Sequence, residues 1–63
     1  MSDATYQHIV EEAQRLFAQK GVTNTTVNDI AVASGKGRRT IYTYFNNKQE
    51  IYQAVVSTEA NRM

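Results

Sequence analysis

Apolar residues recur every three or four positions over the first third of the chain, the period of one helix face. The set comprises Tyr6, Ile9, Val10, Ala13, Leu16 and Phe17. Lys20 falls where a cation favours a helix end, and Gly21 where a left-handed residue commonly closes one. Ser2 or Asp3 can cap the start. The pattern predicts a helix over residues 3–20.

A second, shorter helix is predicted over residues 27–34. Thr26 and Asp29 have the spacing of a capping box, in which each side chain accepts a hydrogen bond from the other residue's amide. The period of the helix then sorts its side chains into two faces. We expect four of them to face inward, namely Val27, Ile30, Ala31 and Ser34. Asn28 and Val32 are expected to face outward.

The segment Gly35-Lys36-Gly37 interrupts the pattern and a third helix is predicted over residues 38–45. A connection of three residues does not let the chain reverse fully, so the third helix must cross the second at a steep angle. Two short helices joined by such a turn form a helix-turn-helix. The expected directions are inward for Ile41 and Phe45, outward for Arg39, Thr40 and Thr43, and flanking for Tyr42 and Tyr44.

A fourth helix is predicted over residues 48–62, because Asn47 and Glu50 have the spacing of another capping box. We expect it to bury Ile51, Tyr52 and Val55, with Val56 as a further candidate. No glycine or proline follows, so the chain is expected to end inside a helix from which a further segment is missing. The predicted fold is all-α, a homeodomain-like helix-turn-helix domain over residues 1–63. Three helices form its core and the fourth begins a linking helix.

The composition fits one small globular domain without covalent staples. The chain has 63 residues, 41% of them hydrophobic and 21% charged, and no cysteine. Its stability must therefore come from helix packing or from a partner chain. No apolar run is long enough for a membrane span, and the N-terminus lacks the features of a signal peptide. A cytoplasmic, nucleoid-associated protein is expected.

Positive charge is concentrated in the middle of the chain, although the net charge is only +1. Residues 30–49 contain no acidic residue and four basic ones, which are Lys36, Arg38, Arg39 and Lys48. Such a patch is the footprint of a protein that meets phosphate over a small area. Taken alone, it is more often an ordinary solvated surface. The predicted helix-turn-helix is what favours DNA.

The third helix has the side chains that a major-groove reader needs near its start. Arg38 and Arg39 can each bind guanine through O6 and N7, and Thr40 can offer its hydroxyl to a base and its methyl to thymine. Other residues are expected to position the protein on phosphates. This set comprises Thr26, Asn28, Lys36, Gly37, Tyr42, Thr43, Tyr44 and Lys48.

Two other classes of function compete with DNA binding. An enzyme is not expected, because His8 is the single histidine and no catalytic set or phosphate-binding glycine loop accompanies it. Glu11 and Glu12 are adjacent and project in different directions, so we predict no metal site, and no cofactor is expected. The rival that remains is a small helical module that dimerises without touching DNA. Steep weakening of binding by salt would distinguish DNA binding from it.

The ordered set of motifs resembles the N-terminal domain of the TetR family of transcriptional repressors, over about residues 9–55. The matching pieces are Leu16-Phe17, Gly21, Thr25-Thr26-Val27, Ile30-Ala31, Gly35, Thr40-Ile41-Tyr42-Thr43-Tyr44-Phe45, and Lys48 with Glu50. The resemblance implies base contacts by Arg38, Arg39 and Thr40, and phosphate contacts by Thr26, Tyr42, Tyr44 and Lys48.

This sequence departs from the family pattern in and after the turn. The family usually has an aliphatic residue at the position of Lys36, commonly serine at Gly37 and often glycine at Arg39. We therefore expect the base preference to depend on Arg39. The resemblance also implies a double-stranded operator as partner. It further implies a C-terminal domain, absent here, that forms a homodimer and binds a small-molecule inducer.

Overall fold

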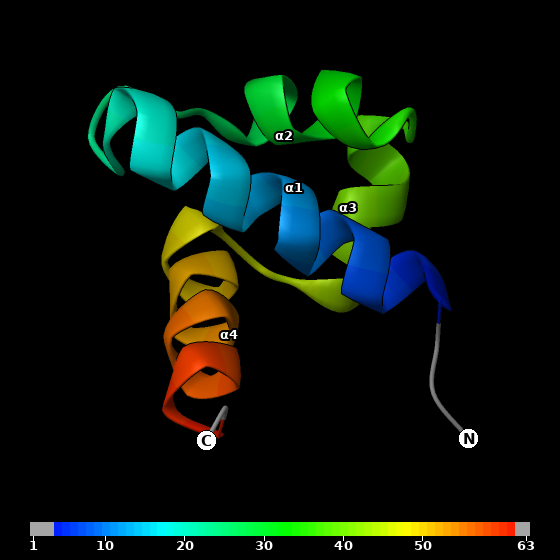
Figure 1. The fold of residues 1–63 in the computed structure, drawn as a ribbon. Coiled ribbons are helices and arrows are strands. Elements are labelled where there is room, and N and C mark those ends of the chain that lie inside the picture. Colours follow the sequence, from blue (N-terminus) through cyan, green and yellow to red (C-terminus); the bar gives the residue numbers. More distant parts are fainter. Residues whose placement is uncertain (1–3, 62–63) are drawn as a thin grey trace.

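The computed structural model describes residues 4–61, and all four predicted helices are present in it (Figure 1). The helices are α1 (Ala4–Lys20), α2 (Val27–Ser34), α3 (Arg38–Tyr44) and α4 (Lys48–Asn61). The expected caps at Ser2 and Asp3 and the last predicted helical residue, Arg62, lie outside the described residues. Within the described part, no helix is long and apolar enough to cross a membrane.

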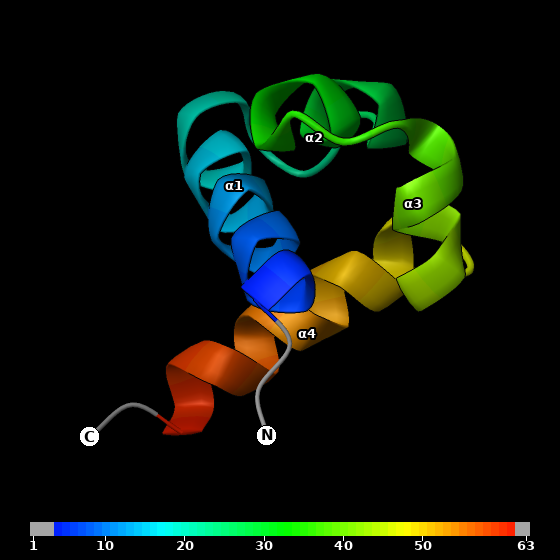
Figure 2. The ribbon, with the colours of Figure 1, turned by 90° about the vertical axis from the view of Figure 1, so that its right-hand side faces the viewer.

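Helix α1 is the centre of the fold. It runs across the middle of Figure 1, with α2 packed above it and α4 below it. Figure 2 shows α3 turning sharply away from the end of α2, as the short connection requires. Every helix or its cap contributes to one core. The buried apolar residues are Ile9, Val10 and Ala13 from α1, Ile30 and Ala31 from α2, Ile41 and Phe45 from α3 and its end, and Ile51 and Val55 from α4.

The predicted capping signals explain where the first two helices end and begin. Gly21 has a φ of 85° and its amide donates to the Phe17 carbonyl, so α1 closes with a left-handed residue. The capping box before α2 is complete: the Thr26 hydroxyl accepts from the Asp29 amide, and the Asp29 carboxylate accepts from the Thr26 amide, both at 3.0 Å. These pairs satisfy backbone groups that helix ends leave without a partner.

The predicted burial was wrong for two residues of α4. Tyr52 is 42% exposed and Val56 is 45% exposed. Ile51 and Val55 lie four residues apart and face α1, whereas their successors lie a further 100° around the helix. The Tyr52 ring makes an edge-on contact with Phe17, with centroids 5.9 Å apart, so it covers the rim of the core.

Two predicted details at the end of α3 and the start of α4 also need correction. Phe45 is not helical: it has extended backbone, with a φ of −135°, yet its side chain is buried. The extended residue lets the chain leave α3 and turn into α4. The Asn47 side chain accepts from the Glu50 amide as expected. The Glu50 carboxylate, however, accepts from the backbone and side-chain nitrogens of Asn46, so the second capping box is displaced by one residue.

Candidate nucleic-acid interface

Four exposed residues share the outer side of α3, and we call them the α3 face. They are Arg38, Arg39, Tyr42 and Thr43. At 100° per residue they span less than half of the helix circumference. Ile41 anchors the opposite side and is fully buried. The helix therefore commits one side to the core and leaves the other for a ligand.

Two side chains of α3 point in other directions than the sequence predicted. Tyr42, predicted on the flank, is 51% exposed and lies within the α3 face. Thr40, predicted to point outward, is half-buried at its edge. Tyr44 is also half-buried, and its ring stands edge-on to that of Tyr6, with centroids 6.0 Å apart. Tyr6 in turn stacks on Phe45 at 5.3 Å, so Tyr44 belongs to an aromatic cluster that fixes α3 against the first turn of α1.

The turn between α2 and α3 is set by Gly35. Its φ of 72° is left-handed, and a Cβ atom added there would meet nothing within 4 Å. The amides of Gly35 and Lys36 donate to the carbonyls of Val32 and Ala31, at 3.2 and 3.0 Å, which is a Schellman motif. Gly37 then has ordinary extended backbone and begins α3 without a side-chain cap. These bonds and the left-handed Gly35 set the direction in which the chain enters α3, and thereby the direction of the α3 face relative to α2.

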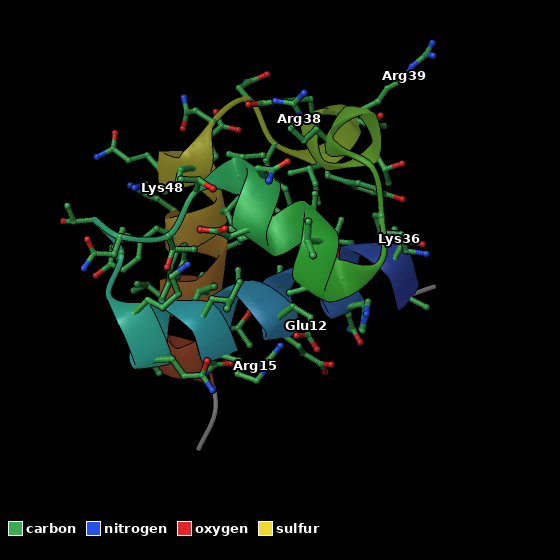
Figure 3. All side chains as sticks on the ribbon, turned by 90° about the horizontal axis from the view of Figure 1, so that it is seen from above. Glu12, Arg15, Lys36, Arg38, Arg39 and Lys48 are labelled. Atoms are coloured by element: carbon green, nitrogen blue, oxygen red, sulfur yellow. The ribbon has the colours of Figure 1, made fainter. Side chains whose placement is uncertain are left out.

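The basic side chains of this region are not neutralised within the described part of the chain. Its two ion pairs join Arg15 to Glu12 and Lys20 to Asp29. Lys36, Arg38 and Arg39 are exposed and take part in neither. Figure 3 shows Arg39 extending away from the ribbon, with the Glu12–Arg15 pair on α1, away from α3. The α3 face therefore has a positive potential available to an external anion.

The hydroxyl and amide side chains predicted to contact phosphates differ in whether a hydrogen-bond donor remains available. The Thr26 hydroxyl accepts from the Asp29 amide, so its own proton remains available. Asn28 is exposed on α2. The Thr43 hydroxyl donates to the Arg39 carbonyl at 3.0 Å. It must give up that bond before it can donate elsewhere.

Lys48 has a contact that the sequence did not reveal. Its ammonium donates to the Val22 carbonyl at 2.7 Å, which links the start of α4 to the loop between α1 and α2. The side chain is half-buried. Figure 3 shows Lys48 on the side of the loop that leads into α2. Sequence reasoning had no signal for this contact, because the two residues are 26 positions apart.

Thr25 is a second residue whose role was missed. It is fully buried, and its hydroxyl donates to the Gly21 carbonyl at 2.8 Å. The run of polar residues before α2 predicted a connection and nothing more. A threonine hydroxyl four residues after a helix-ending glycine was the available signal, because side chains of this type satisfy nearby carbonyls.

The Asp29 carboxyl group, in the first turn of α2, has a shifted pKa. The hydrogen bond from the Thr26 amide, followed by that from Lys20, holds the pKa of Asp29 below its ordinary value of 3.8. Both interactions favour the charged form. The carboxylate therefore stays ionised at neutral pH and keeps the start of α2 in place.

The geometry defines a helix-turn-helix domain, and comparison with known sequences assigns its family. Residues 9–55 match the family described as bacterial regulatory proteins, tetR family. The chain belongs to this family, as its motifs implied. No solved structure matches the chain significantly.

Several curated relatives are bacterial regulators. The chain is 44% identical over 54 residues to the HTH-type transcriptional regulator TtgR of Pseudomonas putida, covering 86% of this chain and 26% of that protein. It is 41% identical over 51 residues to AcrR, a regulator of Shigella flexneri, covering 81% and 24%. It is 37% identical over 57 residues to the transcriptional repressor AcnR of Corynebacterium efficiens, covering 90% and 30%. The chain thus spans about a quarter of the length of these relatives.

Proposed function

We propose that this chain binds double-stranded DNA sequence-specifically, with α3 in the major groove. The observation that carries the proposal is the α3 face, whose two arginines are exposed and not paired with acids in the described part of the chain. The groove is about 12 Å wide and admits one helix. Arg38 and Arg39 contact base edges, and Thr40 reaches a base from the edge of the face.

The remaining residues of the proposed interface set the register on the backbone. Phosphate contacts carry no sequence information but fix where the reading helix lies. In this proposal they come from α2 and its cap, from the turn, from α3 and from the start of α4. The residues are Thr26, Asn28, Lys36, Gly37, Tyr42, Thr43, Tyr44 and Lys48.

In the whole protein, this domain would serve a transcriptional repressor. Relatives are named as transcriptional regulators and, for AcnR, as a repressor. The proposed regulator works as a homodimer on a two-part operator, and a further domain forms the dimer and binds a small-molecule inducer. It acts in the bacterial cytoplasm, at the nucleoid, and not as an enzyme. A single domain would bind weakly, since only a dimer engages two half-sites at once.

Salt dependence tests DNA binding itself. The slope with which log K falls as log salt concentration rises has a magnitude of about 0.9 for each phosphate contact. A fluorescence anisotropy titration of the 63-residue chain with duplex DNA, at several salt concentrations, should give a slope of several units. Negligible or salt-insensitive binding would contradict the proposal and favour a helical interaction module.

The Arg39→Ala variant tests sequence reading. Loss of a bidentate contact to guanine should cost about 1–3 kcal/mol of discrimination between the preferred base and its alternatives. Selection from a random duplex pool, followed by gel-shift titration, measures this preference. Arg15→Ala is the matched control, because Arg15 lies on α1 and pairs with Glu12. Equal preference in the Arg39→Ala variant and the unaltered chain would show that Arg39 does not read a base.

A further inference from the structure

Three side chains donate hydrogen bonds to backbone carbonyls in and beside the loop between α1 and α2. Asn24 donates to the Lys20 carbonyl at 2.9 Å, and Thr25 donates to the Gly21 carbonyl at 2.8 Å. These two contacts are local. Lys48 supplies the third from the first residue of α4, through its bond to Val22.

The Val22 carbonyl is a favourable place for a cation. It follows the end of α1, where the carbonyl ends of the peptide dipoles give a negative potential. The same carbonyl also accepts from the Thr25 amide at 3.2 Å. A hydrogen bond from a charged donor is stronger than one between neutral groups. The Lys48 contact therefore ties α4 to the segment that leads directly into the capping box of α2.

We infer that Lys48 is a positioning residue for DNA binding, which holds the start of α2 in register with the start of α4 through the Val22 carbonyl. This role is additional to any phosphate contact by the same ammonium, which has three N–H donors and uses one on Val22. The inference rests on the proposed DNA binding for its functional consequence. The contact itself can be tested in the free protein.

Amide hydrogen exchange, followed by NMR, tests the contact in the 63-residue chain. In a Lys48→Met variant, the Thr25 amide should exchange about tenfold faster, the effect of losing a charge-assisted bond that stabilises its acceptor. The Phe45 amide, which donates to Ile41 at the end of α3, should be unaffected. Lys48→Arg keeps a charged donor and should restore most of the protection.

Lys36→Met is the matched control, because it removes the same charge from an exposed position in the turn. Its Thr25 amide should exchange at the unaltered rate. Unchanged exchange in Lys48→Met, or equal acceleration at Thr25 and Phe45, would overturn the inference. If the Lys48→Met variant does not fold, the NMR signals of the lysine ammonium groups in the unaltered protein provide the test. The Lys48 ammonium should exchange its protons with water more slowly than the Lys36 ammonium. Equal rates would overturn the inference.

The DNA titration separates positioning from phosphate binding. A lost phosphate contact lowers the salt slope by about 0.9, whereas a misplaced α2 lowers affinity at every salt concentration. Lys48→Met should lower both the slope and the affinity extrapolated to about 1 M salt, and Lys36→Met only the slope. An unchanged extrapolated affinity in Lys48→Met would refute positioning. Failure of the unaltered chain to bind any duplex would instead refute the proposed function, leaving the amide measurements to decide the contact.

Discussion

Asp29 shows how a single side chain can fix a helix start. Its Oδ2 atom accepts from the Thr26 amide at 3.0 Å and from the Lys20 ammonium at 2.9 Å. One carboxylate thereby completes the cap of α2 and connects it to the last residue of α1. The arrangement depends on the charged form, which both partners favour.

The cap should therefore fail in acid. Because the pKa of Asp29 is lower in the folded state, its contribution is fully present above the ordinary value of 3.8 and is lost as pH falls through the folded pKa. The Tm of the unaltered chain should thus fall more steeply below pH 3.8 than that of Asp29→Asn. Circular dichroism melts across this pH range measure the two Tm values. Parallel profiles of Tm against pH in the unaltered chain and in Asp29→Asn would show that the Asp29 cap is not the source of the acid sensitivity.

At the scale of elements, the two glycines of the turn have different reasons to be there. Gly35 is left-handed and closes α2, whereas Gly37 has a φ of −79°, which any residue adopts. An added Cβ would meet open space at either position. The difference between them is therefore one of backbone conformation alone.

Substitution by alanine should separate the two glycines. Gly35→Ala should lower the free energy of unfolding by about 1–2 kcal/mol, the cost of a left-handed L-residue. Gly37→Ala should change it by less, since its backbone is compatible with a side chain. Urea denaturation of the two variants gives the comparison. Equal losses would show that the conformation of Gly35 is not what the turn requires.

The sequence predicted the elements well because their signals are local. Apolar spacing, the Thr26–Asp29 capping box and the glycines placed the helix ends that lie within the described residues to within one residue. What it missed depends on tertiary packing. The outward side of α4 at Tyr52 and the contact from Lys48 to Val22 arise only when α1 and α4 meet. The roles of the α3 residues on DNA stay predictions.

The whole molecule depends on one core shared by four short helices. At about 0.05–0.15 kcal/mol per residue, a chain of this length has roughly 3–9 kcal/mol of stability. Ile51 of α4 is fully buried in that core, with Ile9, Ile30 and Ile41 from the other helices. Helix α4 is thus part of the folding unit, although its outer side is exposed.

Ile51→Ala should destabilise the whole molecule and not α4 alone. Removing a buried isoleucine side chain costs about 2–5 kcal/mol, which is a large share of the expected stability of roughly 3–9 kcal/mol. Circular dichroism melts should show all four helices lost together, in a single transition at a lower Tm than in the unaltered chain. Val32→Ala is the control, because Val32 is 73% exposed and its loss should have little effect. Separate melting of α4, with α1, α2 and α3 retained to a higher temperature, would mean that α4 folds independently.

The shortness of α3 limits how much sequence one domain can distinguish. Its 7 residues, at about 1.5 Å each, give a helix of about 10 Å, the length of about three stacked base pairs. The side of α3 that carries Ile41 is already committed to the core. A sequence of so few base pairs recurs very many times in any genome, where non-specific sites compete for the protein. A binding site that occurs once in a genome must therefore consist of several such short sequences at fixed spacing, and its uniqueness comes from their arrangement.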